Sequence, residues 1–364
     1  DAKNLTVLPG CIDTQVHFRE PGSTDAEDLN SGSKAAVAGG ITSVFEMPNT
    51  NPPTSSKKEF LNKLKLAKDR MYCNYAFYFG ATPDNHKELS ELKDLEGCCG
   101  IKLFAGSSTG DLLVQHEKDI EKVFQNSSKI VSVHSEDEEI LNMRKKLIKE
   151  GDVSTHPIWR NEECAISSTR RIVKIAERYK KKAHILHVTT KEEIDFLAQH
   201  KGNVSFEVTP QHLTIFAPDC YDKLGTYAQM NPPLRDKSHY DRLWYGVRNN
   251  IPDIIGSDHA PHLKENKEKN YPNSPSGMPG VQTLVPVMLN HVNEEKLSLK
   301  QFVDFVCENP VKIFGIKNKG FIKEGFDADL TIVDMNKKHT VKNQEIESKC
   351  KWSPFNGMEF KGKP

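Results

Sequence analysis

The feature that most constrains the fold of this chain is the alternation of short apolar runs with segments of helical periodicity. Helical spacing is clear at 57–70 and 191–200, and a longer helical region covers 138–179 with interruptions near Gly151 and Pro157. Eight strands alternating with helices are typical of the α/β class, and of a (β/α)8 barrel of about 250 residues. The apolar runs begin within 8–22 and continue at 41–47, 74–80, 100–104, 129–134, 183–188, 204–208 and 253–256.

An open, doubly wound parallel sheet is the main alternative to the barrel. Such a sheet normally binds its ligand at a single switch point, beside a glycine-rich turn. The sequence contains no G-x-G-x-x-G pattern. We therefore predict a (β/α)8 barrel of the TIM type over residues 8–315.

The region after the last barrel strand has a different character. Two helices are predicted at 281–293 and 299–314, and β-type stretches follow at 325–334 and 352–357. These two stretches are too short to fold alone. We expect residues 316–364 to be the C-terminal β-type segment of a small accessory domain, to which the chain ends contribute and whose other strands lie outside this sequence.

Composition excludes several classes of function. The 364 residues include 50 basic and 50 acidic side chains, so no basic field attracts nucleic acid. No apolar run approaches the roughly 18 residues that span a membrane, and no charged-then-apolar leader is present. The eight cysteines form no C-x-x-C pair, which argues against a disulfide framework and favours a reducing cytoplasm.

Polar side chains stand at the ends of several predicted strands. In a (β/α)8 barrel the C-terminal strand ends converge on one opening. A single histidine there is more often a core or surface residue than a ligand, but chance is a poor explanation for several together. Imidazole and carboxylate groups in one opening suit zinc. The residues at these strand ends are His17, Asn49, Lys102, His134, His187 and Asp258.

The same opening contains candidates for catalysis and for substrate binding. Two-metal sites activate a bridging water, and a carboxylate beside that water serves as general base and later as acid. Asp258 is the candidate for this role. Arg19 can hold a carboxylate bidentately, His262 lies on the same loop as Asp258, and Asn49 can hydrogen-bond an amide.

Three of these positions also admit an ordinary structural interpretation. A strand-end lysine such as Lys102 commonly reaches solvent, and a protonated lysine cannot ligate a cation. The alternative is that CO2 carboxylates the Lys102 amine, which then bridges two metals; the apolar neighbours in G-I-K-L-F favour this recessed lysine. Arg19 could form a surface salt bridge with Glu20 or Asp25, and His259 could support the site without contacting a ligand.

Seven spaced motifs in one order give the chain a specific resemblance to a known family. The sequence resembles the dihydroorotases, cyclic amidohydrolases of the amidohydrolase superfamily, from Leu8 to about Gly357. The motifs are D-T-Q-V-H-F-R-E-P-G, M-P-N-T, G-I-K-L-F, V-H-S-E, L-H-V-T-T, N-P-P-L-R and G-S-D-H-A-P-H.

This resemblance implies a zinc-dependent hydrolase that interconverts N-carbamoyl-L-aspartate and L-dihydroorotate in the pyrimidine (UMP) pathway. It implies one or two zinc ions, a carboxylated Lys102, and a metal-bound hydroxide as nucleophile with Asp258 as general base and acid. It further implies a homodimer and an association with aspartate transcarbamoylase. By similarity the metal ligands are His17, Lys102, His134, His187 and Asp258.

The resemblance also assigns the substrate contacts and the loops around them. Arg19, Asn49 and His262 are expected to contact the substrate through their side chains, and Asn231 through its backbone. The segments 107–110 and 278–280 are expected to close over the site.

The sequence departs from the family pattern in three ways. The usual first histidine of the opening H-x-H motif is Gln15, whose neutral amide oxygen is a weaker zinc ligand than imidazole. Gln211 replaces a common histidine at a position that we do not expect to be a ligand. Much of the terminal β-sandwich that family members usually carry is missing from this sequence.

Two other functions remain open from the sequence. A dihydropyrimidinase, hydantoinase or allantoinase would act on a related ring without the ring carboxylate, which the pairing of Arg19 with His262 disfavours. Gln15 suggests an inactive homologue that is retained as a scaffold. The remaining site residues, which are all present, argue against this hypothesis.

Overall fold

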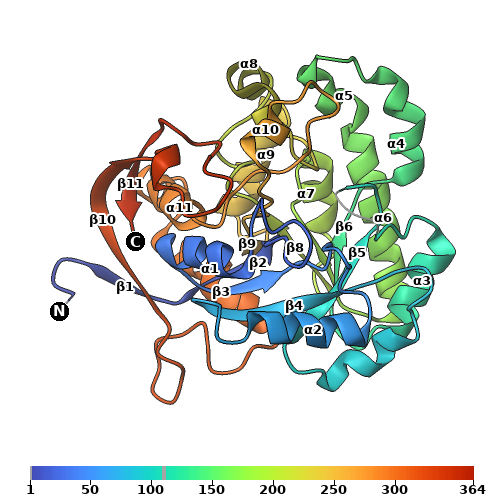
Figure 1. Cartoon of the computed structure of the whole chain (residues 1–364), viewed down its shortest axis with the longest axis horizontal. Helices are drawn as coiled ribbons and strands as arrows, with labels where there is room; N and C mark the ends of the chain where they lie inside the picture. The colour runs from blue at the N-terminus through green and yellow to red at the C-terminus, as the bar shows by residue number, and fades with distance from the viewer. Residues whose placement is uncertain (1, 109–111) are drawn as a thin grey trace.

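The computed structural model describes residues 2–108 and 112–364, and its centre is a parallel eight-stranded sheet rolled into a barrel (Figure 1). Each strand pairs with the next along the chain, and a parallel bridge between Val16 and His259 joins the first strand to the segment after the last. The predicted (β/α)8 barrel is confirmed. Its strands are β2 (Cys11–Val16), β3 (Ile41–Glu46), β4 (Asn74–Gly80), β5 (Cys98–Phe104), β6 (Val131–His134), β7 (Ala183–Ile185), β8 (Val204–Val208) and β9 (Ile254–Ile255).

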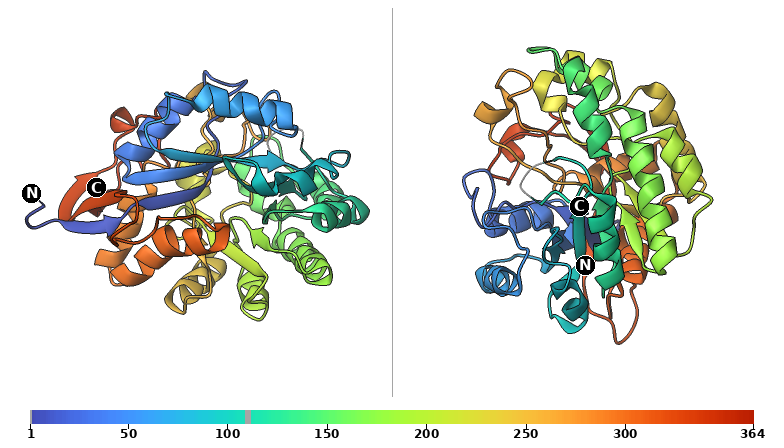
Figure 2. Two further views of the ribbon diagram at one scale, coloured as in Figure 1. Left: turned by 90° about the horizontal axis from the view of Figure 1, so that it is seen from below. Right: turned by 90° about the vertical axis from the view of Figure 1, so that its right-hand side faces the viewer.

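Helices surround the barrel on the outside (Figure 2). The predicted region 138–179 is divided by 3-10 turns into three α-helices, and 299–314 contains a π-helical turn at Asp304–Glu308. The α-helices are α1 (Leu29–Ala38), α2 (Lys57–Ala67), α3 (Glu117–Asn126), α4 (Glu138–Arg144), α5 (His156–Trp159), α6 (Glu162–Tyr179), α7 (Lys191–Leu197), α8 (Asp219–Leu224), α9 (Lys237–Arg248), α10 (Lys264–Lys267), α11 (Leu284–Asn293), α12 (Leu299–Val303) and α13 (Asn309–Phe314).

Local sequence explains where several helices begin. Asp28 caps α1 by accepting the backbone N–H of Ser31, whose hydroxyl accepts the Asp28 N–H in return. Thr190 and Glu193 form the same reciprocal capping box at the start of α7. Each box satisfies backbone donors that the first helical turn leaves unpaired. None of the helices in residues 2–108 and 112–364 has the length and apolar character to cross a bilayer.

A small antiparallel sheet from the two chain ends lies beside the barrel (Figure 1). It contains β1 (Thr6–Pro9), β10 (Leu330–Thr340) and β11 (Glu359–Lys363), in the order β1-β10-β11. The predicted contribution of the chain ends to a β element is confirmed. Gly10 separates β1 from β2, and a Cβ at this position would lie only 2.3 Å from the Thr42 hydroxyl.

Two boundaries in the C-terminal region differ from the sequence prediction. The stretch predicted at 325–334 becomes a strand only at Leu330 and continues to Thr340, because its partner β1 pairs from Leu330 to Val333. The stretch predicted at 352–357 is not a strand. It turns over the barrel, and the third strand of the small sheet is Glu359–Lys363 instead.

Candidate active site

The predicted site residues meet in one cavity at the C-terminal ends of the barrel strands. His17 directly follows β2, Lys102 lies within β5, and His134 ends β6. All of the predicted metal ligands, Gln15 and three of the four predicted substrate contacts line this cavity. The lining residues are Gln15, His17, Arg19, Asn49, Lys102, Phe104, Ser108, His134, His187, Asn231, Asp258, Ala260, Ser276 and Gly277. The fourth predicted contact, His262, borders an adjoining cavity together with Arg19 and Asn49.

The backbone that presents three of these side chains is strained. Arg19, His187 and Asp258 have φ angles of 62°, 38° and 45°, in the left-handed region that non-glycine residues seldom adopt. Residues held in this region cost about 1–3 kcal/mol each and cluster at functional sites. The surrounding fold therefore holds these side chains where unconstrained backbone would not place them.

Lys102 is buried and lies close to the other ligand-type residues. Only 1% of its surface is exposed, and its Nζ lies 4.4 Å from the centroid of the Phe104 ring. Burial lowers the pKa of the Lys102 amine to about 7, although Asp258 opposes this shift. The interpretation of Lys102 as a solvated strand-end lysine is therefore wrong, and a substantial fraction of the amine is uncharged at neutral pH.

Asp258 shares its carboxylate with two neighbours. Its Oδ1 accepts a hydrogen bond from the Gln15 amide at 2.9 Å and lies 3.2 Å from His17 Nε2. Burial raises the pKa of Asp258 to about 7, while the Lys102 charge opposes the rise. Near neutral pH this carboxyl group can therefore both accept and return a proton, as a general base and acid requires.

The histidine tautomers leave lone pairs directed into the site. His17 Nδ1 lies 2.8 Å from Asn49 Oδ1, an acceptor, so this nitrogen carries the hydrogen and Nε2 faces Asp258 as a second acceptor. His134 Nε2 likewise donates to Glu136 at 2.8 Å, and its Nδ1 lies 3.0 Å from His187 Nε2. His17 Nε2 and Asp258 Oδ1 are two acceptors in contact, which need a proton or a cation between them, whereas His187 Nε2 can carry a hydrogen and donate it to His134 Nδ1.

These contacts bear on whether the site can hold a metal. Within residues 2–108 and 112–364, no three or more histidine, cysteine or acidic side chains are arranged as a group that could hold a metal ion. Gln15 Oε1 is buried with no hydrogen-bond partner, which costs about 1–3 kcal/mol. The acceptor pair of His17 and Asp258 and this oxygen without a partner are the kinds of atom that a cation would bind.

Arg19 is directed to the edge of the cavity by a neighbouring loop. Its Nε donates to the Pro261 carbonyl at 3.1 Å, and its Nη2 lies 3.2 Å from His262 Nε2. Burial lowers the pKa of Arg19 to about 10, so the guanidinium keeps its charge at neutral pH. The alternative of a surface salt bridge is wrong, because Arg19 is buried and Glu20 pairs with Arg70 instead.

Sequence reasoning missed a buried ion pair behind His134. Glu136 bonds His134 Nε2 on one side and the guanidinium of Arg160 on the other, and Arg160 also donates to the Ser107 carbonyl at 2.7 Å. Burial raises the pKa of Glu136, but the contacts with Arg160 and His134 outweigh burial and hold this pKa well below its usual range. Glu136 was visible within V-H-S-E, whereas nothing in the sequence indicated Arg160.

The remaining predicted positions lie around the cavity. Asn231 Oδ1 lies 3.0 Å from His156 Nε2. His259 accepts the Gly280 N–H at 3.0 Å and lies behind the site. Gln211 donates to the Ser257 carbonyl and is absent from the lining residues.

One of the two predicted loop segments contributes a residue to the cavity lining, and the other follows two lining residues. Of segment 107–110, Ser107 binds the Glu138 carboxylate and Ser108 lines the cavity, while Thr109 and Gly110 lie outside the described residues. For segment 278–280 the lining residues are the preceding Ser276 and Gly277.

A cluster of histidine, lysine and aspartate side chains therefore lies at the mouth of a (β/α)8 barrel. The model of the amidohydrolase family matches residues 6–364, and the chain belongs to that family.

Relatives of known name refine this class. A dihydroorotase of Methanosarcina acetivorans is 36% identical over 375 residues, covering 99% of this chain and 79% of the relative. A dihydroorotase of Pyrococcus abyssi is 38% identical over 362 residues, covering 99% and 81%. Among solved structures, an L-hydantoinase from Arthrobacter aurescens matches with a TM-score of 0.95 and 30% identity, covering 100% of this chain and 84% of that one.

Proposed function

We propose that this chain is a dihydroorotase, which adds water across the ring amide of L-dihydroorotate to form N-carbamoyl-L-aspartate and also catalyses the reverse cyclisation. The observation that carries this proposal is the pairing of Arg19 with His262 at the edge of the cavity that contains Asp258. A buried guanidinium beside an imidazole is suited to bind the ring carboxylate. This reaction belongs to pyrimidine biosynthesis, and the named relatives support it.

The site fits one or two zinc ions, and a bound zinc would polarise the ring carbonyl and acidify the attacking water. The neutral histidine nitrogens that face the cavity are suitable ligands, and Gln15 Oε1 can contribute a weaker one. The ligands that we propose are His17, Lys102, His134, His187 and Asp258.

Lys102 becomes an anionic ligand in this proposal. The uncharged amine attacks CO2, a new N–C bond forms, and one proton leaves to solvent. The burial that lowers the pKa of Lys102 to about 7 supplies the nucleophilic, uncharged amine. The charge at this position changes from zero in the uncharged amine to negative in the carbamate, so Lys102 attracts a cation in place of the repulsion that its ammonium form would exert.

The side chains of the cavity divide the chemistry between them. Asp258 accepts a proton from the attacking water and delivers it to the ring nitrogen as the amide C–N bond breaks. Arg19 and His262 hold the carboxylate, so the ring amide faces Asp258. Asn49 contacts His17 and lines both cavities. We expect its side chain and the backbone of Asn231, which lines the first cavity, to contact the substrate.

A hydantoinase or dihydropyrimidinase activity is the second candidate, because the L-hydantoinase structure has the same fold. Those ring substrates lack the carboxylate for which Arg19 and His262 are placed. The assembly that we propose is a homodimer, with aspartate transcarbamoylase as a further partner. We propose the cytoplasm as its location, since all eight cysteines are free thiols.

The test is the metal content of the purified protein together with turnover of L-dihydroorotate, dihydrouracil and hydantoin. Zinc and turnover of dihydroorotate alone, lost in Arg19→Ala, support the proposal. Turnover of the two rings without a carboxylate, unaffected by Arg19→Ala, establishes the second candidate. If the protein turns over none of the three substrates after zinc and bicarbonate are supplied, both proposed activities are rejected. The inactive scaffold is then the remaining hypothesis.

A further inference from the structure

The carboxylate-binding side of the cavity depends on the position of one short loop. Residues 256–263 connect the last barrel strand to α10 and carry both the Pro261 carbonyl and the His262 ring that contact Arg19. These two contacts orient the Arg19 side chain. The placement of the His262 backbone therefore determines the distance between the guanidinium and the imidazole.

A tryptophan from the C-terminal segment holds this backbone. Trp352 is only 2% exposed, and its indole Nε1 donates to the His262 carbonyl at 2.8 Å. Its ring packs edge-on against Tyr227, with the centroids 4.9 Å apart, and lies 5.7 Å from the Lys267 amine. The two residues joined by this hydrogen bond are 90 positions apart in the chain.

The opposite side of His262 is held by a second set of contacts. His262 Nε2 lies 3.0 Å from the carbonyl of Ser276, a residue that also lines the catalytic cavity. The side-chain amide of Gln229 donates to the Ser276 hydroxyl. The Lys267 amine, which is fully buried, donates to the backbone carbonyl of Gln229 and to that of Pro275, the latter at 2.8 Å. His262 is thus fixed through its ring on one side and its carbonyl on the other.

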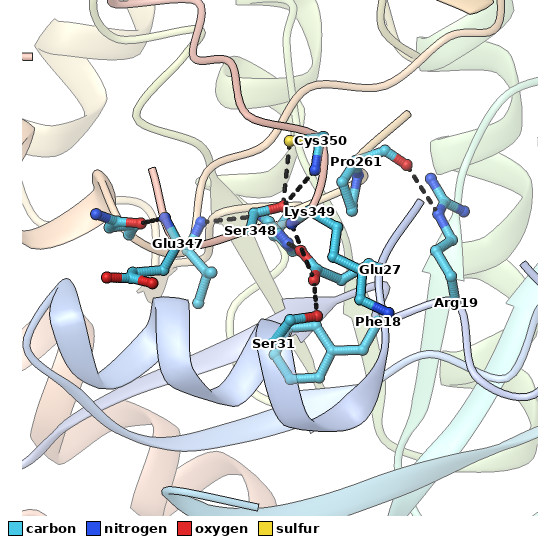
Figure 3. A network of polar contacts seen from close by, with 12 residues as sticks. Phe18, Arg19, Glu27, Ser31, Pro261, Glu347, Ser348, Lys349 and Cys350 are labelled. Carbon is cyan, nitrogen blue, oxygen red and sulfur yellow. Dashed lines mark hydrogen bonds and ion pairs between the residues drawn. The ribbon is translucent and has the colours of Figure 1, made fainter. Parts of the chain in front are cut away.

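The C-terminal segment that carries Trp352 is itself anchored to the barrel (Figure 3). The Lys349 amine donates to the Thr24 carbonyl at 2.7 Å and forms an ion pair with Asp28, at the start of α1. The Glu347 N–H donates to Gln282 at 2.8 Å. Figure 3 draws Lys349 and Cys350 of this segment together with Glu27, and marks the hydrogen bond from Arg19 to the Pro261 carbonyl. The contacts of Glu347 and Lys349 hold the segment that carries Trp352, and so fix the position of the indole relative to His262.

We propose that Trp352 is a positioning residue for the Arg19–His262 pair, so that the C-terminal segment sets the geometry in which the substrate carboxylate binds. This inference rests on the proposed function. The indole contacts neither the reacting ring nor Asp258. Its loss should weaken carboxylate binding and leave the chemical step intact.

The test replaces Trp352 by phenylalanine, which keeps an aromatic ring but removes the N–H donor. Trp244→Phe is a matched control, because Trp244 is also 2% exposed and its Nε1 donates to the Leu213 carbonyl at 2.9 Å, away from the cavity. Both variants lose one buried indole-to-carbonyl hydrogen bond. Zinc content, thermal stability, KM and kcat for L-dihydroorotate are measured on both full-length proteins.

The expected result is a rise in KM of about 5- to 10-fold in Trp352→Phe, with kcat within about twofold of the wild type, since only binding common to substrate and transition state is lost. The affinity for orotate, a planar analogue with the same carboxylate, falls in parallel. Trp244→Phe changes stability alone. If the two variants have the same KM and orotate affinity, the inference is overturned while the proposed function stands. If the wild-type protein does not turn over L-dihydroorotate, the proposed function itself is overturned.

A second measurement reads the wild-type protein and does not depend on the folding of Trp352→Phe. The chain has three tryptophans, so the indole N–H region of a nitrogen-15 spectrum has three signals; Trp159→Phe and Trp244→Phe assign two of them, and the third belongs to Trp352. Orotate is expected to shift the Trp352 signal, and uracil, which lacks the carboxylate, is not. A Trp352 signal that orotate leaves in place contradicts the proposal.

Discussion

Two buried aspartates in this barrel have similar electrostatics and different surroundings. Burial raises the pKa of both Asp13 and Asp258 to about 7. Asp258 borders the cavity, whereas Asp13 lies within β2 and accepts the backbone N–H groups of Ser257 and Gln15, at 3.0 and 3.2 Å. Burial perturbs any carboxyl group, so a shifted pKa identifies chemistry only where the group also reaches a cavity.

The same contrast recurs for two buried histidine–glutamate pairs. His134 lines the cavity, and Glu136 lies behind it, with His134 Nε2 and Glu136 Oε2 2.8 Å apart. His184 and Glu207 lie inside the barrel at 3.1 Å, where Glu207 also accepts from the Thr14 hydroxyl, and neither residue lines the cavity. The pair at the cavity orients a ligand-type histidine, and the pair inside the barrel satisfies buried polar groups.

The largest expected effect separates the two aspartates. Asp258→Asn should lower kcat for dihydroorotate by about 10³-fold or more, because the amide cannot accept and return the proton. Asp13→Asn should keep kcat within about threefold, because the amide oxygen still accepts both backbone N–H groups. Steady-state kinetics on both variants checks this. Equal losses would show that reaching the cavity does not distinguish the two carboxyl groups.

The next effect separates the two histidine–glutamate pairs. Glu136→Gln should weaken zinc binding about 10- to 100-fold, since the carboxylate fixes the tautomer of His134 and raises its basicity. Glu207→Gln is the matched control and should reduce thermal stability with little change in zinc affinity. Competition with a chelator measures both affinities. A larger loss of zinc in Glu207→Gln would reverse the assignment of the two pairs.

A gain of affinity is expected at the position that departs from the family pattern. Gln15→His should strengthen zinc binding by about tenfold, because imidazole is a better zinc ligand than a neutral amide oxygen. The change also removes the buried Gln15 Oε1 that has no hydrogen-bond partner. Zinc titration of both proteins tests this. Unchanged affinity would place residue 15 outside the metal site.

The last effect concerns stability and pH, not activity. Folded Asp13 keeps its proton up to a pKa of about 7, whereas the unfolded side chain releases it near 3.8. The folded state therefore binds more protons between pH 4 and 7, and this contribution to the free energy of unfolding is lost as the pH rises through 7. Asp13→Asn should remove about 2–4 kcal/mol of this dependence, measured by urea unfolding at pH 4 and 7. Equal pH dependence in both proteins would mean that Asp13 is ionised when folded.

Much of the fold and of the site was predictable from local pattern. Eight apolar runs alternating with helical segments predicted the barrel, and polar residues at strand ends predicted a convergent site, because parallel barrel strands bring their carboxyl ends together. The prediction of a strand at 352–357 was wrong, because apolar residues form a strand only where another strand is available to pair with them. Arg160 could not be found, since its role depends on a contact with Glu136 across 24 positions.

The sequence by itself determined the order of strands and helices, the polar side chains at the strand ends and the family, because periodicity and motifs are properties of neighbouring residues. Only the tertiary structure decided which buried carboxyl group opens to the cavity, and that Trp352 holds His262. The physical reason is that burial and cavity access arise from contacts between distant segments. Asp13 and Asp258 are the same residue type, and the fold alone makes one of them a candidate acid and base.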